Sequence, residues 1–186
     1  RDQGDGLVGS EMCIRDRRWS MGLSALFLAG CNTLEPLPTV DYVDLDRFMG
    51  DWYVIANIPT SIEKDAYNAV ESYRMEEDGS IATTFTFNKG GFDGEKKQYN
   101  PRGFVLNAQT NAEWGMQFIW PIKADYRIIY LDEDYRLTVI GRNKRDYVWL
   151  MAREPSLTRD EFKAMQSLIQ DAGSDISEFR EVPQQG

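Results

Sequence analysis

The sequence predicts an all-β fold with one α-helix after the last strand, and three observations predict it. Eight β-rich segments follow one another at steady spacing between residues 50 and 153. Short turns separate most of them, and Asp78-Gly79 between two such segments is typical of a β-hairpin. A segment with apolar residues at helical spacing follows the eighth. This pattern is typical of an up-and-down barrel or of a β-sandwich.

Each expected strand is bounded by residues that end it or turn the chain. Pro59 follows the first strand, Pro121 the fifth and Pro155 the eighth. A loop rich in Gly and Lys at 89–97 separates the third strand from the fourth, and the other turns contain Asp, Asn or Gly. The eight strands are therefore expected at residues 50–58, 68–76, 81–88, 102–107, 114–120, 125–131, 137–142 and 147–153.

The helix is expected to begin after Thr158 and to end near Gly173. Thr158 and Glu161, three residues later, match a capping box, in which each side chain bonds the other residue's backbone N–H. Gly173 is a typical residue to end a helix. One apolar stripe, which can pack on the outside of the sheet, is formed by Phe162, Met165, Leu168 and Ile169.

The composition excludes several classes of function. The chain has 21 Lys and Arg against 30 Asp and Glu, so its net charge is −9, which repels nucleic acid phosphates. It contains no histidine, and its two cysteines, Cys13 and Cys31, precede all predicted strands. Ser–His or Cys–His catalysis, a histidine metal site and a disulfide framework are therefore not expected in the β-rich region. We predict no metal, cofactor or nucleic acid partner.

The N-terminal region has the layout of a secretion signal. Two arginines precede an apolar run at 19–28, which is too short to span a bilayer and which leads into Leu-Ala-Gly-Cys31. This ending resembles the bacterial lipobox, whose cysteine is acylated and becomes the first residue of the mature protein. The alternative is a buried helix that ends in cysteine. Asn32 after the cysteine favours the outer membrane over the inner one, by the sorting pattern of such lipoproteins.

These features divide the chain into segments. Residues 1–17 show no initiator Met and no periodicity, and we expect them not to belong to the native protein. Residues 18–30 are the expected signal peptide. Residues 31–41, with two prolines, are the expected tether between a lipid on Cys31 and the domain. The barrel domain is expected at 42–182 and a tail at 183–186.

Three short motifs resemble those of the lipocalin family. Gly50-Asp51-Trp52-Tyr53 is similar to the family's Gly-x-Trp signature on the first strand. Asp125-Tyr126 resembles the second motif, with Ala124 in place of its usual Thr, and Arg153 resembles the third. Segments 131–136 and 146–150 resemble those of the bacterial outer-membrane lipoproteins of this family. The resemblance covers about residues 41–182 and implies an eight-stranded up-and-down antiparallel barrel with the C-terminal helix packed outside.

Three motif residues are expected to close one end of this barrel and not to bind a ligand. Trp52 offers a large apolar area that can plug the base. Arg153 can lie over its indole face and donate to backbone carbonyls of the entering segment. Gly50 permits a close approach of the chain at this point.

Side-chain alternation along the strands predicts which residues face the barrel interior. The inward set is aromatic and aliphatic with several phenols, which suits an acyl chain or another elongated apolar ligand. The alternative is a solid core, and the resemblance favours a cavity. Tyr130 and Met151 are also predicted to face inward. The expected ligand-binding residues are Val54, Ala56, Tyr73, Phe85, Phe87, Met116, Phe118, Trp120, Tyr126, Ile128, Tyr147 and Trp149.

Charged residues near this interior fall into two groups. Glu71 is predicted to face inward, where a carboxylate is unfavourable unless it is hydrated or paired. Either it lies at a wet mouth, or its strand is shifted by one residue. Loop lysines are candidates to meet an anionic head group at the mouth, although such side chains are more often simply solvated: Lys64, Lys89, Lys96 and Lys97.

The sequence and the resemblance together predict a non-enzymatic protein that binds or transports a hydrophobic ligand. The resemblance implies fatty acids or lysophospholipids as ligands. A lipid on Cys31 would hold the protein at the outer membrane, on its periplasmic face. Two alternatives are an envelope lipoprotein whose barrel docks a partner, and a lipid-modifying enzyme that uses carboxylates. The resemblance also allows a homodimer, for which the sequence itself carries no signal.

Overall fold

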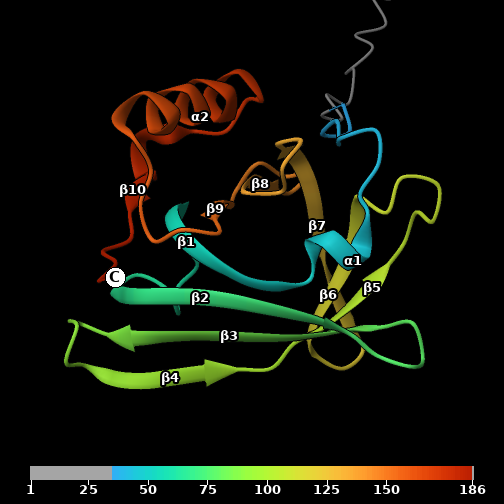
Figure 1. The fold of residues 1–186 in the computed structure, drawn as a ribbon, viewed down its shortest axis with the longest axis horizontal. Helices are drawn as coiled ribbons and strands as arrows, with labels where there is room; N and C mark the ends of the chain where they lie inside the picture. Colours follow the sequence, from blue (N-terminus) through green and yellow to red (C-terminus); the bar gives the residue numbers. More distant parts are fainter. Residues whose placement is uncertain (1–34, 186) are drawn as a thin grey trace, which may run out of the picture. The chain divides into compact units, whose positions relative to one another are not determined.

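The strands close into an antiparallel barrel because β1 pairs with β2 on one side and with β9 on the other (Figure 1). A computed structural model describes residues 35–185, so residues 1–17, the expected signal peptide and Cys31 lie outside the described part. The barrel strands are β1 (Gly50–Ile58), β2 (Ala66–Met75), β3 (Ile81–Lys89), β4 (Glu95–Tyr99), β5 (Arg102–Val105), β6 (Glu113–Ile119), β7 (Ile122–Leu131), β8 (Leu137–Gly141) and β9 (Val148–Ala152).

The barrel has eight strand positions, which confirms the predicted fold. β4 and β5 both pair with β3, one after the other, and the break at Asn100 and Pro101 divides a single position between them. β4 lies in the segment 89–97 and just beyond it, where the sequence predicted a loop. Its residues are exposed or half-buried and form no apolar run, so the periodic signal of a strand is weak there.

Two bulges change which side chains face the interior. The pairing register shifts between Val54 and Ala56 on β1, and between Ile128 and Tyr130 on β7. Val54 and Ile128 face inward as predicted, whereas Ala56 and Tyr130 belong to a cluster on the outside of the barrel. The prediction that Ala56 and Tyr130 face the interior is wrong because one extra residue reverses the alternation beyond each bulge.

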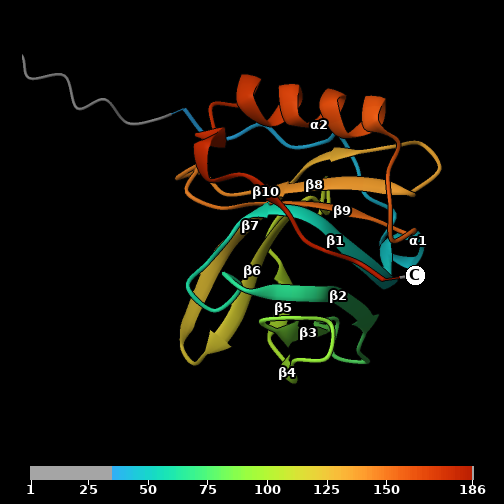
Figure 2. The same cartoon turned by 90° about the vertical axis from the view of Figure 1, so that its left-hand side faces the viewer.

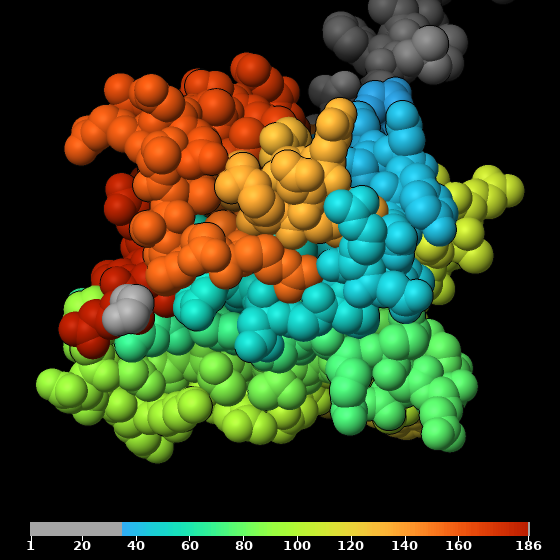
Figure 3. All heavy atoms as spheres, viewed as in Figure 1, coloured from blue at the N-terminus to red at the C-terminus, as the bar shows by residue number. Residues whose placement is uncertain are grey.

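The C-terminal helix α2 (Arg159–Asp171) packs on the outside of the barrel, as predicted (Figures 2 and 3). Its capping box between Thr158 and Glu161 is present, and Gly173 follows with a φ of +89°. Met165 and Ile169 are buried in the outer cluster, against residues of β1, β8 and β9. Figure 3 shows the orange helix above and the green strands β2–β4 on the opposite side.

Short elements flank the barrel that the sequence did not predict. Helix α1 (Leu45–Phe48) precedes β1 and begins at Asp44, whose carboxylate accepts from two backbone N–H groups. After α2, the 3-10 helix η1 (Ile176–Glu178) leads to β10 (Arg180–Glu181), which pairs with β1. Both helices are shorter than the span over which apolar periodicity can be recognised.

The two ends of the described chain pack against the barrel. Leu37 is buried, and its N–H donates to Asn143 Oδ1 at 2.8 Å. The expected tether therefore docks from Leu37 onward. At the other end, Gln184 Nε2 donates to the carbonyls of Val54 on β1 and Ala69 on β2, so the expected tail bridges these strands.

Residues 35–185 belong to one unit, and all the strand pairings and both apolar clusters found among these described residues lie within it. The barrel therefore has within this unit all the contacts that fold it. Within residues 35–185, no helix has the length and apolar character needed to cross a membrane.

Candidate ligand cavity

One end of the barrel is filled by an aromatic cluster around Trp52. The side chains of Trp52, Trp114 and Phe48 are fully buried, and the ring centre of Phe48 lies 5.1 Å from that of Trp52 and 5.4 Å from that of Trp114. Trp52 Nε1 donates to the carbonyl of Phe48 at 2.9 Å. Because α1 carries Phe48, this short helix covers the end, which we call the base of the barrel.

Arg153 locks the base from outside. Its guanidinium carbon lies 3.8 Å from the centre of the Trp52 ring, a cation–π contact. Gly50 has a φ of +94°, and a Cβ there would lie 3.4 Å from Arg153 Nη1. The structure thus places all three motif residues at the base, as the sequence predicted. Arg153 donates to four backbone carbonyls at 2.7–3.0 Å, those of Arg47, Phe48, Met49 and Asp51.

Beyond the base the barrel encloses a cavity of about 270 Å³. This volume lies just below the ~300–1,000 Å³ of typical small-molecule pockets and suits one slender chain. It opens near the β1–β2 connection, residues 59–65, and we call this opening the mouth. Its lining is formed by Thr60, Ser61, Ile62, Glu63, Glu71, Phe85, Met116, Phe118, Ala124, Asp125, Tyr126, Arg142 and Trp149.

A hydrogen-bonded chain of three side chains lies between the base and the cavity. Tyr73 donates to Glu71, and the hydroxyl oxygens of Tyr73 and Tyr126 are 2.6 Å apart. Because Tyr73 gives its one hydrogen to Glu71, Tyr126 is the donor in the second bond. The ring of Tyr126 stacks on Trp114 with centres 5.3 Å apart. Glu71 and Tyr126 therefore face the cavity from a firmly held floor.

Burial governs the protonation of this floor. It raises the pKa of Glu71 from 4.5 to about 7; the hydrogen bond from Tyr73 lowers this pKa, and the charge of Glu63 raises it. Burial also raises the pKa of Tyr73 and of Tyr126 well above 10. Near neutral pH, Glu71 is therefore partly protonated while both tyrosines are neutral. The inward placement of Glu71 agrees with the predicted register of its strand.

The β1–β2 connection is held at the mouth by Glu63. Its buried carboxylate accepts from the N–H and the hydroxyl of Thr60 at 2.8 and 2.7 Å, and from Trp149 Nε1 at 2.9 Å. The last bond links the connection to β9. Trp149 is consequently fixed with its ring against the cavity, while the neighbouring Ser61 and Ile62 stay exposed.

Arg142 supplies positive charge at the mouth. Its Nη1 lies 3.4 Å from Asp146, and its guanidinium carbon lies 5.2 Å from the centre of the Tyr147 ring. Among the described residues, its buried Nε has no hydrogen-bond partner. Asp125 also lines the cavity but is occupied, since it accepts from Arg127 Nε and from the N–H of Asn143. Arg142 is thus the cavity's cationic group for an anionic ligand atom.

The predicted cavity residues separate into three groups. Five line the cavity: Phe85, Met116, Phe118, Tyr126 and Trp149. Four are buried in the inner cluster without lining it: Val54, Tyr73, Phe87 and Ile128. Three lie elsewhere, and for these the predicted place in the lining is corrected: Ala56 and Tyr147 pack with the outer cluster, and Trp120 is 82% exposed at the β6–β7 turn.

The sequence missed the lining residues that come from connections and strand ends. Residues 60–63 follow β1, where the sequence pattern showed only a connection, and Arg142 follows β8, although the sequence predicted it as the last residue of that strand. Of the predicted mouth lysines, three border a separate hollow beside Ile62, namely Lys64, Lys89 and Lys97. Lys96 is exposed on β4 and does not border it.

Comparisons with known proteins bear on this barrel and its cavity. The profile of a family described as a lipocalin-like domain matches residues 43–184. The outer membrane lipoprotein Blc of Escherichia coli is 27% identical, with 88% of this chain and 93% of that protein aligned. Temperature-induced lipocalin-1 of Arabidopsis thaliana is also 27% identical, over 80% of this chain and 83% of that protein. In fold, the cockroach allergen Per a 4 is similar with a TM-score of 0.62 at 15% identity, covering 83% of this chain and 97% of that one.

Proposed function

Because this chain belongs to the lipocalin-like family, whose members bind small hydrophobic ligands, we propose that it carries single-chain amphiphiles. Fatty acids and lysophospholipids are the proposed ligands. The acyl chain lies between Phe85, Met116 and Ala124, and the head group lies at the mouth. In this arrangement Arg142 meets the carboxylate or phosphate, while Ser61 offers a hydroxyl group.

The observation that carries this proposal is the narrow apolar cavity with a cation at its opening. A barrel filled to its mouth would favour the alternative of a docking module, and about 270 Å³ of space within the walls favours a ligand instead. Enzymatic action has little support: lipocalins are generally carriers, and the carboxylates of Glu63 and Asp125 are held by two or more donors each. We therefore propose binding without catalysis.

We further propose the periplasmic face of the bacterial outer membrane as the place of action. The support is the lipobox-like Leu-Ala-Gly-Cys31 in the sequence together with similarity to a protein named as an outer membrane lipoprotein. Acyl chains on Cys31 would hold the barrel beside its ligands. A membrane-fractionation experiment with the full chain and with Cys31→Ser tests this, since only the former should be found in the outer membrane.

Ligand binding is tested by titration of residues 31–186, carrying Cys31→Ser and stripped of lipid. C16–C18 fatty acids and the corresponding lysophospholipids are added while tryptophan fluorescence is followed, because Trp149 borders the cavity. Saturation near one ligand per chain or per dimer is expected. Comparison of the dissociation constants of the two ligand series shows which head group is bound more tightly.

Ala124→Phe should block the cavity, since Ala124 lies opposite Met116 on the inner wall. We expect at least about a tenfold loss of affinity, because the added ring fills the space of the acyl chain. Ala82→Phe is the matched control, since Ala82 alternates with buried residues of β3 and points outward. Equal affinity in wild type and Ala124→Phe, or no saturable binding in a cooperatively folded domain, would contradict the proposal.

A further inference from the structure

We propose that the β6–β7 hairpin inserts into a phospholipid bilayer and sets the mouth of the cavity against the membrane. The docking tip is defined as Phe118, Ile119, Trp120, Pro121 and Ile122. The inference deepens the proposed function and rests on it, because a mouth held at a bilayer serves a carrier of membrane amphiphiles. It concerns a second membrane contact besides the proposed lipid anchor.

The tip exposes more apolar surface than any other segment of the described residues. Phe118 is 52% exposed, Ile119 72%, Trp120 82% and Ile122 68%. These four make up most of the exposed large hydrophobic side chains in residues 35–185. Single exposed apolar residues are ordinary, but a contiguous patch indicates a contact with a protein or a membrane.

The chemistry of the tip fits a bilayer. No Asp or Glu occurs between Glu113 and Asp125, although the whole chain has a net charge of −9. Tryptophan favours the interface between head groups and acyl chains, where Trp120 would lie. Lys123 follows the tip and adds a positive charge beside it, with its Nζ over β5, 3.7 Å from the centre of the Phe104 ring.

The tip is continuous with the mouth. Phe118 is part of the tip and of the cavity lining, and Ile62 across the opening is also exposed and lines the cavity. Figure 2 shows the β6–β7 hairpin and the β1–β2 connection along the same side of the barrel. An acyl chain that leaves the bilayer at the tip would therefore pass into the cavity along apolar surface.

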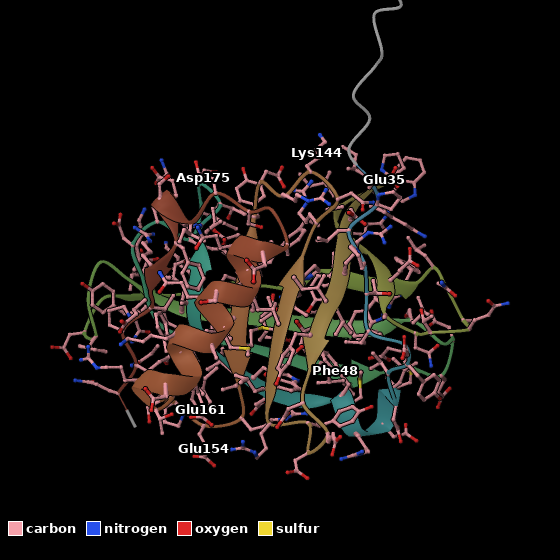
Figure 4. All side chains as sticks on the ribbon, turned by 90° about the horizontal axis from the view of Figure 1, so that it is seen from above. Glu35, Phe48, Lys144, Glu154, Glu161 and Asp175 are labelled. Carbon is pink, nitrogen blue, oxygen red and sulfur yellow. The ribbon has the colours of Figure 1, made fainter. Side chains whose placement is uncertain are left out.

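The described chain begins on the same side. The carbonyl of Glu35 accepts from Arg145 Nη2 at 3.0 Å, in the β8–β9 connection at the mouth end. Figure 4 shows Glu35 and Lys144 at one edge of the barrel, with Phe48 of the base away from that edge. Cys31 is four residues before Glu35, so a lipid on it is attached within about 14 Å of Glu35. Anchor and tip together would fix the orientation of the mouth.

Vesicle binding by residues 31–186 with Cys31→Ser isolates the tip from the lipid anchor. The protein is mixed with vesicles of phosphatidylethanolamine and phosphatidylglycerol, and the bound fraction is measured by sedimentation. Vesicles that contain brominated phospholipid should quench the fluorescence of Trp120, and this quenching should disappear in Trp120→Phe. The double variant Ile119→Ser/Trp120→Ser should bind about tenfold or more weakly, because membrane affinity scales with inserted apolar area.

The matched control removes two exposed apolar residues at the opposite end. Tyr42 and Leu106 are 59% and 61% exposed; Tyr42 precedes α1, and Leu106 follows Val105, which pairs with Trp114 of the base. Tyr42→Ser/Leu106→Ser should leave vesicle binding unchanged. Equal losses in both double variants, or bound protein without quenching of Trp120, would overturn the proposal.

A second copy of the chain is the other candidate to cover the tip. Sedimentation velocity without vesicles tests it: a dimer that Ile119→Ser/Trp120→Ser dissociates, with no vesicle binding by wild type, overturns the membrane role. Ligand titration separates this inference from the proposed function. Intact ligand uptake without vesicle binding refutes the docking tip alone, and vesicle binding without ligand uptake refutes the carrier.

Discussion

The base and the mouth of the barrel use similar side chains in opposite ways. At the base, Trp52 and Trp114 are fully buried, and Arg153 donates to four carbonyls around them. At the mouth, Trp120 is 82% exposed, and Trp149 is tied to the carboxylate of Glu63 beside an open cavity. The base is therefore built for stability, and the mouth keeps surface free for contacts outside the barrel.

The base and the mouth also differ in how fully their buried polar groups are hydrogen-bonded. The Trp52 indole N–H has a carbonyl partner at the base. Among the described residues, three buried side-chain polar atoms have no partner, and two of them lie toward the mouth, on Asn57 beside Trp149 and on Arg142. Since an unpaired buried polar atom destabilises the fold, its persistence near a cavity is typical of a site completed by a ligand or water.

The largest effect is expected at the base. Trp52→Ala should lower the free energy of unfolding by about 3–5 kcal/mol, because it removes a fully buried indole and leaves a cavity beside Phe48 and Trp114. Urea denaturation measures the change. A loss below about 1 kcal/mol would mean that the base is not the stabilising end.

Arg153→Lys tests how much the hydrogen bonds of Arg153 stabilise the base. Lysine keeps the charge over Trp52 but cannot reach four carbonyls with one ammonium group. We expect a loss of about 2–3 kcal/mol, from several hydrogen bonds to a charged donor worth about 1 kcal/mol or more each. Arg142→Lys, at the mouth, is the control and should change the unfolding free energy by less. Similar losses of unfolding free energy in Arg153→Lys and Arg142→Lys would contradict the proposed difference between the base and the mouth.

How much the sequence could predict also differs between the two regions. Gly50, Trp52 and Arg153 were predicted at the base because their roles depend on local motifs, an aromatic after Gly50 and an arginine that ends the last strand. Their buried neighbours Phe48 and Trp114 were not predicted there. The cavity lining was predicted where the alternation of a strand is unbroken, as at Phe85 on β3 and at Tyr126 on β7, which precedes the bulge of that strand. The bulges before Ala56 and Tyr130 turn these two side chains from the inner to the outer face of the barrel. A bulge depends on how a strand pairs with its neighbour, and the sequence does not show this pairing.

The missed residues at the mouth have a related cause. Residues 60–63 line the cavity because Glu63 binds Trp149, a contact across 86 positions that no local pattern records. Trp120 was assigned inward by counting along β6, but the strand ends at Ile119 and the chain turns there. Local chemistry thus predicted the type of cavity, while long-range contacts decided which residues form it.

The floor of the cavity should respond to pH. Between pH 4.5 and about 7 the folded state holds the proton of Glu71 more tightly than the unfolded state does, so stability falls as pH rises through this range. The ceiling is about 3 kcal/mol, at about 1.4 kcal/mol per pKa unit. Glu71→Gln should therefore be about 1–2 kcal/mol more stable than wild type at pH 8 and nearly equal at pH 4. Glu77→Gln, in an exposed turn, serves as the control in urea denaturation at both pH values.

Ligand affinity should depend on the protonation of Glu71. An ionised Glu71 opposes the burial of an acyl chain beside it, since the chain would displace water from the carboxylate. The dissociation constant for a lysophospholipid, whose phosphate does not titrate in this range, should rise about three- to tenfold between pH 6 and pH 8.5. This rise should be absent in Glu71→Gln. A rise of equal size in that variant would assign the pH dependence to another group.

The smallest effect is expected for the tryptophan at the mouth. Trp120→Ser should change the free energy of unfolding by less than about 0.5 kcal/mol, because the side chain is 82% exposed and its removal leaves no cavity. Comparison with Trp52→Ala tests whether tryptophan stabilises the fold at the base but not at the mouth. A stability loss above about 1 kcal/mol would show that Trp120 supports the barrel in solution. An unchanged stability with weaker vesicle binding would assign this exposed indole to contacts with lipid.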